Sequence, residues 1–350
     1  MKKIVFLMFL LSILCFGNSS SLFFKAIKNK NYNEVESIIN KGYDIELKNS
    51  NNESALTLAI QNNDIKMIEL LIKNGININP EKEGKWDCSY LAQALVTESR
   101  EISKILIEYG ADVNDEFVVP MVGYYQYLTP LIWVCSKNDL ELCKLIINSG
   151  AEVNKVMEGE FALDVAIQTN SVQCAELLIE KGADIYHKST LGESLIISTF
   201  VNDSIGCFKL LEEAGISLND KYKFLSRPSE SLLNLALQNN AKKISNFLIE
   251  REIGLNEKNS YGEIPINLAI YNYNLKAVEL LLEKGINIDS VNNEGYSPLM
   301  IAIIMDNTIM VQFLLEKGAN VKLRTNDGKS LLQLATSPKM RKFLIAKGVK

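Results

Sequence analysis

Cysteines are the residues of this chain with the richest potential chemistry, and their spacing argues against a metal site. The sequence has six cysteines, which are Cys15, Cys88, Cys135, Cys143, Cys174 and Cys207, and it contains no CxxC pair. A buried cysteine packs like a small hydrophobe, which is the simpler interpretation of the five that follow Cys15. Cys135 and Cys143 fall on consecutive predicted helices, so they could alternatively meet as a disulfide in an oxidising compartment.

Patterns for catalysis and cofactor binding are missing from the sequence. The single histidine, His187, lies in a predicted turn without a nucleophile in a recognisable motif, and an exposed turn residue is the simpler interpretation. The sequence has no HExxH zinc motif and no Gly-rich phosphate loop. Its Asp and Glu residues recur at predicted turns and helix surfaces, where they solvate the chain. We therefore predict no enzymatic activity, no bound metal and no cofactor.

One sequence unit recurs along most of the chain with a period of about 33 residues, which is typical of stacked repeats. Each unit ends in a glycine and a pattern such as GADVN, which begins at Gly42, Gly75, Gly110, Gly150, Gly182, Gly215, Gly285 and Gly318. A second motif runs in step with it, as SALTLA, TPLIWV, FALDVA, SLLNLA, IPINLA and SPLMIA. The spacing from the end of this motif to the next glycine is the same from Ala59 to Gly75 as from Val134 to Gly150. The two motifs therefore belong to one repeating unit.

Elementary helix chemistry explains both motifs. Thr129 can cap free backbone N–H groups, and Pro130 follows at a position that needs no N–H, so TPLIWV begins a helix. Segments such as LKAVELLLEKG carry aliphatic residues at helical spacing and end at Gly285, which favours the left-handed backbone of a helix terminus. Turn-forming clusters such as SVNNEGYS lie between the units. Each unit is thus two antiparallel helices and a projecting finger, and neighbours must stack to bury a core.

These motifs resemble the ankyrin repeat, with its TPLHxA opening and GADVN ending, over about ten copies from Ser21 to Lys350. The resemblance implies an all-α ankyrin-repeat solenoid with short β-hairpin-like fingers, in the form of an elongated curved rod. It also implies a non-enzymatic module that binds another protein. The copies lack the His of TPLHxA, which leaves the usual polar contact between repeats in doubt. Glu252 replaces the glycine that ends the second helix, so we expect a weak point in the seventh repeat.

Residues 1–20 have the layout of a secretory signal peptide. Lys2 and Lys3 precede an apolar run from Ile4 to Phe16, and small polar residues follow. The run is short for a membrane span, so we expect none in the mature protein. We predict a periplasmic or secreted bacterial protein whose mature chain consists of residues 21–350. Lipid anchoring at Cys15 is a minor alternative. Cleavage would change the formal charge from −5 to 35 minus 42, or −7, which disfavours nucleic acid as a partner.

Three fingers are longer than the repeat requires, and they carry aromatic residues. The step between equivalent motif positions lengthens after the second, third and sixth repeats, and it is longest from Ala94 to Val134. The candidate partner-binding residues are Trp86 and Tyr90 in the first insertion, Phe117, Met121, Tyr124, Tyr125 and Tyr127 in the second, and Tyr222, Phe224 and Arg227 in the third. The alternative is that the long fingers fold back and pack their aromatic side chains on the rod. Trp133 occupies the Leu position of the helix motif, and we predict that it lies in the core.

The sequence therefore predicts an exported, monomeric repeat rod that binds a protein partner through its fingers and its concave first-helix face. Two versions differ in where the partner is found, either a resident envelope protein or a host or rival protein reached after release. A purely structural envelope spacer is the alternative of a different class, and it predicts no dependence on the long finger.

Overall fold

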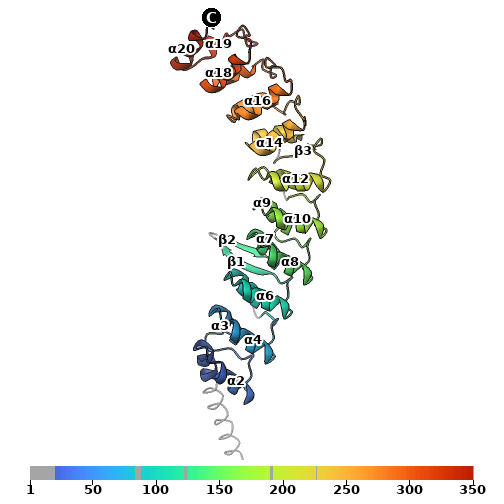
Figure 1. The fold of residues 1–350 in the computed structure, drawn as a ribbon, viewed down its shortest axis with the longest axis vertical. Coiled ribbons are helices and arrows are strands. Elements are labelled where there is room, and N and C mark those ends of the chain that lie inside the picture. The colour runs from blue at the N-terminus through green and yellow to red at the C-terminus, as the bar shows by residue number, and fades with distance from the viewer. Residues whose placement is uncertain (1–19, 83–87, 122–123, 190–191, 226, 350) are drawn as a thin grey trace, which may run out of the picture. The chain divides into compact units, whose positions relative to one another are not determined.

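The computed structural model describes residues 20–82, 88–121, 124–189, 192–225 and 227–349. The predicted signal peptide, except for Ser20, and the candidate residue Trp86 lie outside these residues. The chain divides into two compact units, residues 1–162 and 163–350. Within each unit, antiparallel helix pairs stack on one another, as Figure 1 shows. The expected all-α repeat architecture is confirmed.

The described residues of the first unit form four helix pairs and one two-stranded hairpin. Residues 20–28 are helical and pair with the next helix of the chain. The elements that follow are α2 (Tyr32–Asn40), α3 (Ala55–Gln61), α4 (Ile65–Lys73), α5 (Tyr90–Val96), α6 (Arg100–Glu108), β1 (Phe117–Met121), β2 (Tyr124–Leu128), α7 (Pro130–Ser136) and α8 (Leu140–Asn148).

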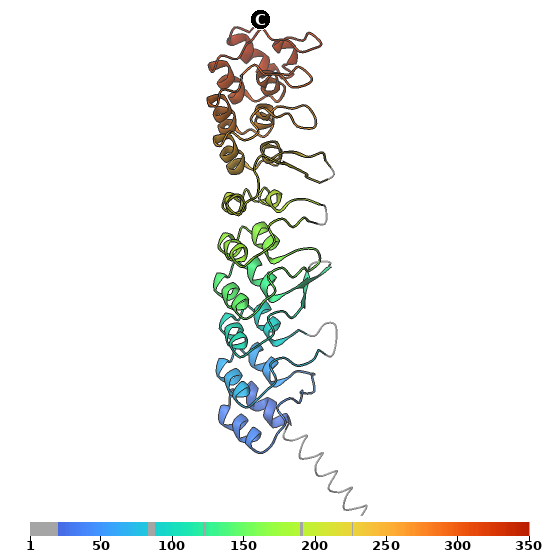
Figure 2. The ribbon, with the colours of Figure 1, turned by 90° about the vertical axis from the view of Figure 1, so that its right-hand side faces the viewer.

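The second unit repeats the plan. Its elements are α9 (Ala162–Gln168), α10 (Val172–Glu180), α11 (Leu195–Ser198), α12 (Ile205–Glu213), β3 (Lys221–Tyr222), β4 (Glu230–Ser231), α13 (Leu232–Gln238), α14 (Lys242–Glu250), α15 (Pro265–Tyr271), α16 (Leu275–Glu283), α17 (Pro298–Ile304), α18 (Thr308–Glu316), α19 (Leu331–Leu334) and α20 (Pro338–Ala346). In each unit the fingers project to the same side of the helices (Figure 2).

The helix termini behave as the sequence predicts. The hydroxyl of Thr129 accepts a hydrogen bond from the backbone N–H of Ile132 at 3.2 Å, and Pro130 is the first residue of α7. At the end of α16, Gly285 has φ +82°, and the next amide, Ile286 N–H, donates to the carbonyl of Leu281 at 3.1 Å. This is the left-handed ending expected of a glycine at that position.

Glu252 ends α14 in the same way without a glycine. Its φ is +62°, a left-handed conformation that a side chain adopts at a cost of about 1–2 kcal/mol. Its carboxylate lies 2.9 Å from the Nζ atom of Lys284 in the next repeat. The seventh repeat therefore keeps the regular fold, and the expected weak point is one strained residue.

The asparagine of the GADVN motif links two repeats of the first unit to the repeats that follow them, through the backbone. Asn114 Nδ2 donates to the carbonyl of Gly150 at 3.0 Å, and Asn114 Oδ1 accepts from the amide of Glu152 at 2.8 Å. Asn79 makes the same two contacts, with Gly110 and Asp112, one repeat earlier. One amide side chain thus satisfies a donor and an acceptor of the neighbouring turn, which explains why Asn recurs at this position.

Replacing Asn114 with alanine should lower the free energy of unfolding by about 1–2 kcal/mol, because both backbone groups lose their partner. Chemical denaturation followed by circular dichroism measures this change. Asn51 is exposed in a turn of the same unit, and Asn51→Ala is the matched control. Equal stability of the two variants would contradict the linking role.

The polar contact between repeats that the motif histidine usually makes is made by other side chains in the second unit. Asn234 and Asn267 occupy the histidine position of their motifs. The Nδ2 atom of Asn234 donates to the carbonyl of Glu257 at 2.9 Å, and that of Asn267 donates to the carbonyl of Tyr296 at 3.5 Å. Both acceptors belong to the finger of the following repeat, so an asparagine here performs the bridging that the motif assigns to His.

Candidate protein-binding surface

The longest insertion forms a two-stranded antiparallel hairpin. β1 pairs with β2 from Phe117 opposite Leu128 to Met121 opposite Tyr124. The sequence of the two strands, FVVPM and YYQYL, is rich in β-branched and aromatic residues, which favour paired strands over a solvated loop. The extra residues of this finger are therefore used for strand pairing.

The hairpin has a buried root, and its opposite end carries two exposed tyrosines, Tyr124 and Tyr125 of β2, which are called the tip below. At the root, Phe117 is 2% exposed, Val119 9% and Leu128 5%. At the tip, Tyr124 is 58% exposed and Tyr125 53%. The sequence leaves two alternatives open for this finger, which are packing against the helices and exposure to a partner. Each of them applies to a different part of the hairpin. Burial removes Phe117 from the surface that a partner could touch in this conformation.

Charged side chains from the neighbouring fingers hold the base of the hairpin on both sides. Lys82 Nζ lies 2.6 Å from the carboxylate of Asp115, and Lys155 Nζ lies 3.0 Å from that of Glu116. Lys155 Nζ also donates to the backbone carbonyl of Asn114 at 2.9 Å. Together with the buried root, these contacts fix the direction in which the tip points.

Trp133 links the hairpin root to a pocket and is half-buried, so the prediction that it lies in the core is only partly right. Its ring packs edge-on against Phe117 with centroids 6.2 Å apart. Its Nε1–H donates to the carbonyl of Leu95 at 3.2 Å, and Lys137 Nζ lies 4.7 Å from the ring centroid. An indole has a polar N–H that needs a partner, which a Leu at the same position does not.

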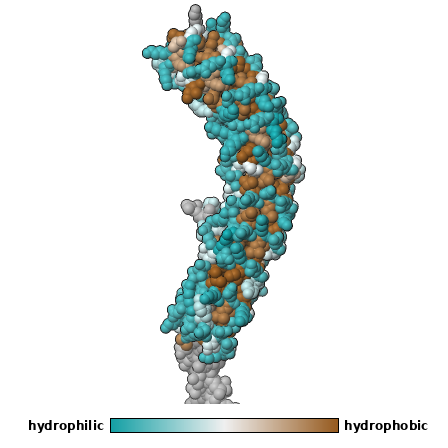
Figure 3. Space-filling view, viewed as in Figure 1, coloured by the Kyte–Doolittle hydropathy of each residue, from teal (hydrophilic) through white to brown (hydrophobic). Residues whose placement is uncertain are grey.

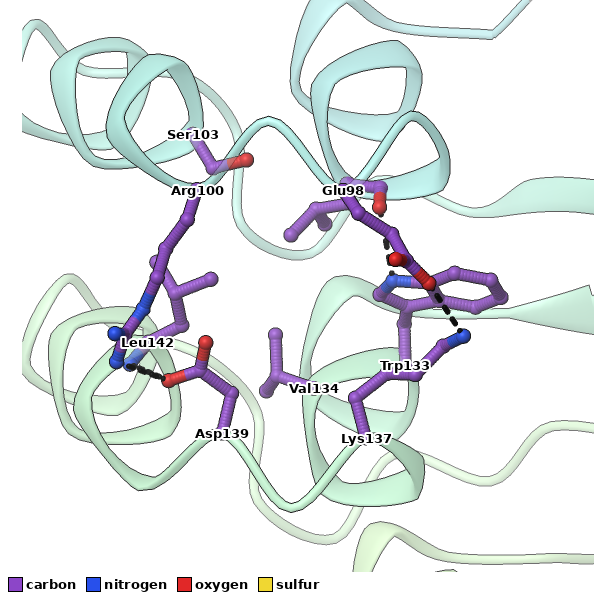
Figure 4. Close-up of a pocket in the computed structure, with 9 residues that line it drawn as sticks. Glu98, Arg100, Ser103, Trp133, Val134, Lys137, Asp139 and Leu142 are labelled. Atoms are coloured by element: carbon purple, nitrogen blue, oxygen red, sulfur yellow. Dashed lines mark hydrogen bonds and ion pairs between the residues drawn. The ribbon is translucent and has the colours of Figure 1, made fainter.

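The pocket beside Trp133 has a volume of about 290 Å³ and lies between the third and fourth repeats. Its apolar lining is Leu95, Trp133, Val134 and Leu142. Two ion pairs flank it, as Figure 4 shows: Arg100 with Asp139 at 2.8 Å, and Lys137 with Glu98 at 2.9 Å. The hydrogen bond and the charge of Asp139 raise the pKa of Arg100 above its ordinary value.

The first insertion contributes no exposed aromatic side chain among its described residues. Tyr90 is 6% exposed and starts α5, where its hydroxyl donates to Ser54 Oγ at 2.9 Å. Ser54 is the capping residue of α3, so Tyr90 connects two repeats. This burial corrects the assignment of Tyr90 to the partner-facing residues. The motif offers a signal for this burial, because Tyr90 stands at the second position of SYLAQA, and Ala55 and Leu232 at the same position of their motifs are also buried.

The third insertion is partly ordered by the short β3–β4 pair, in which Tyr222 lies opposite Glu230. Tyr222 and Phe224 are half-buried, and the Tyr222 hydroxyl donates to the carbonyl of Ser217. Arg227 is exposed, and its Nη1 donates to Gln238 Oε1 at 3.2 Å. The described residues of this finger include three exposed cations, Lys221, Lys223 and Arg227, and two aromatic side chains that are partly covered.

Tyr222 gives the protein a specific sensitivity to alkaline pH. Burial, then the charge of Asp220, raises the pKa of Tyr222 from 10.0 to about 12. The folded state thus favours the protonated phenol, so this stabilisation is complete below pH 10 and is lost as the pH rises through about 12. We expect Tyr222→Phe to lose less stability than the wild type over that interval in denaturant titrations. Parallel pH profiles for the two proteins would refute this.

Among the residues with potential chemistry, His187 departs from the prediction, whereas the cysteines of the helices are buried as expected. His187 is half-buried, with Nε2 3.4 Å from Asp164 Oδ2, so the prediction of an exposed turn residue is wrong. Asp164 stands at the histidine position of FALDVA. In this pair the finger therefore supplies the imidazole, that of His187, and the helix supplies the carboxylate, that of Asp164. Cys135 and Cys143 are buried with their Sγ atoms 3.8 Å apart. No cluster of His, Cys, Asp and Glu suited to a metal ion occurs among the described residues.

The viewed face of each unit intersperses hydrophilic and hydrophobic residues (Figure 3). No helix within the described part of the chain has the length and apolar character needed to cross a membrane.

Known proteins similar to this chain share its repeats. The chain is 28% identical to an ankyrin repeat protein of Rickettsia felis over 220 residues, which are 62% of this chain and 54% of that protein. It is 30% identical to one of fowlpox virus over 209 residues, covering 59% of this chain and 35% of that protein. The match thus spans about half or less of the length of these relatives.

Two solved structures share the fold. The ankyrin repeat domain of human ASB11 has a TM-score of 0.53 at 24% identity, covering 63% of this chain and 98% of that one. The ankyrin repeat domain of Bcl-3 has a TM-score of 0.50 at 21% identity, covering 62% and 98%. At these identities the likeness concerns the fold alone.

Family models cover most of the sequence. A model described as ankyrin repeats in three copies matches residues 23–117, 121–189 and 195–292, and one described as ankyrin repeats in many copies matches residues 281–335. With the paired helices, the glycine endings and the bridging asparagines, these matches establish that the chain belongs to the ankyrin repeat family.

Proposed function

We propose that this chain binds a partner protein through the tip of the β1–β2 hairpin and the adjoining first-helix face. Ankyrin repeats are protein–protein interaction modules, and their fold is a non-enzymatic scaffold. The observation that carries the proposal is the contrast between the buried root and the exposed tyrosines of the hairpin. A tyrosine offers a large contact area and a polar group at low entropic cost, so a rigid support for two of them favours recognition.

The test is affinity capture from an envelope extract of the source organism with three forms of the chain. The first is the wild type, and the second carries Tyr124→Ala and Tyr125→Ala. The third carries Tyr109→Ala, which removes a tyrosine of 57% exposure from the end of α6 in the same unit. Substitution at the tip is preferable to shortening the finger, because shortening would also remove the buried Phe117.

A protein captured by the wild type and by Tyr109→Ala, but lost with the double variant, supports recognition by the hairpin tip. Capture of the same proteins by all three forms refutes it. A structural spacer predicts the same behaviour for all three, so that alternative would then be favoured.

We further propose that the protein acts outside the cytoplasm, as a periplasmic or secreted molecule. The support is the layout of residues 1–20, with two lysines, an apolar run and small polar residues. N-terminal sequencing of the protein recovered from envelope and medium fractions tests this. A mature end near residue 20 is expected, whereas an intact N-terminus in the cytoplasmic fraction would contradict export. Recovery from the envelope favours a resident partner, and recovery from the medium favours a host or rival protein.

A further inference from the structure

Two buried cysteines face each other within the repeat that follows the hairpin. Cys135 lies near the end of α7 and Cys143 in the first half of α8, and each side chain is 0% exposed. Their Sγ atoms are 3.8 Å apart. A disulfide holds its sulfur atoms about 2.0 Å apart, so rotation of the two side chains or an approach of the two helices must bring the sulfur atoms closer before the bond forms.

We propose that Cys135 and Cys143 form a disulfide that joins the two helices of the fourth repeat. Two thiols lose two protons and two electrons as one S–S bond forms, and a small-molecule disulfide such as oxidised glutathione takes them up as it becomes two thiols. Because both sulfur atoms are buried, we expect the bond to form while the chain folds.

The position of this bond connects it to the candidate binding surface. Val134 and Leu142, the residues directly before the two cysteines, both line the pocket beside Trp133. Closing the short loop between the cysteines would restrain the unfolded chain and hold these two walls together. Bond formation itself does not depend on whether the hairpin tip binds a partner, so the two proposals fail separately.

The experiment is to refold the full chain in a glutathione redox buffer, alkylate the remaining thiols and map the peptides by mass spectrometry. The expected product joins Cys135 to Cys143, while Cys174 and Cys207 carry the alkyl group. Alkylation of all the cysteines, or random pairing among them, would overturn the proposal. Cys174→Ala is the matched control, since it replaces another fully buried cysteine of a second helix and should leave the cross-link intact.

Thermal unfolding gives an independent readout. The oxidised wild type should melt several degrees above the same protein after reduction, and this difference should vanish in Cys143→Ala. A difference that persists in Cys143→Ala would assign the effect to other cysteines and refute the proposed pair.

Discussion

Replacing Phe117 with alanine should lower the free energy of unfolding by about 3–5 kcal/mol, the largest loss that we expect from a single residue of the long finger. The phenyl ring is 2% exposed and packs edge-on against Trp133, so its removal leaves a cavity beneath the hairpin root. Without that anchor, the hairpin would also lose its fixed direction. Chemical denaturation followed by circular dichroism, with tryptophan fluorescence as a second probe, measures both effects.

Tyr124→Ala is the matched control for this loss, because it removes an aromatic side chain of the same hairpin that is 58% exposed. Its stability should stay within about 0.5 kcal/mol of the wild type, as for most surface substitutions. If Phe117→Ala and Tyr124→Ala were equally stable, the division of the hairpin into a buried root and an exposed tip would be incorrect.

Gly262→Ala should lower the free energy of unfolding by roughly 2–4 kcal/mol, from a left-handed backbone and a steric clash together. Gly262 has φ +79°, and a Cβ atom there would overlap the side-chain amide of Asn293 in the next finger. The backbone amide of Asn293 also donates to the Gly262 carbonyl at 3.1 Å, so the two fingers are held in close contact. Thermal and denaturant unfolding both measure the change.

Gly328 provides the control for this substitution. It is the equivalent finger glycine near the end of the chain, with φ +82°, but nothing lies within 4 Å of its Cβ position. Gly328→Ala should therefore show only the backbone cost of about 1–2 kcal/mol. The difference between the two variants measures the clash with Asn293, and its absence would mean that the fingers are not in close contact.

Local chemistry explains why so much of the fold could be predicted. The capping by Thr129, the glycine endings such as Gly285 and the regular repeat period each depend on neighbours in sequence. Ten helix pairs follow from them in the described residues. The bridging role of Asn114 could not be predicted from its neighbours in sequence, because its partners Gly150 and Glu152 lie one repeat away.

The candidate site was predicted less well, since burial within a finger depends on what the finger folds against. Phe117 and Tyr124 are similar aromatic residues of one insertion, yet Phe117 packs against Trp133 and is buried, whereas Tyr124 is exposed. His187 is a further example, because it is half-buried beside Asp164, which lies in a helix of the preceding repeat. The residues of paired strands alternate between buried and exposed, and this alternation could have indicated which aromatic residues of the insertion are buried. It applies only if the insertion is known to form strands.

The measurement that tests the central claim most directly is the dissociation constant of the captured partner for the wild type and for the Tyr124→Ala, Tyr125→Ala variant. Two exposed tyrosines that contact a partner each contribute about 1 kcal/mol or more, so we expect the constant to rise at least about tenfold, while Tyr109→Ala leaves it unchanged. A dissociation constant for the double variant within a factor of about two of the wild type would contradict recognition through the hairpin tip.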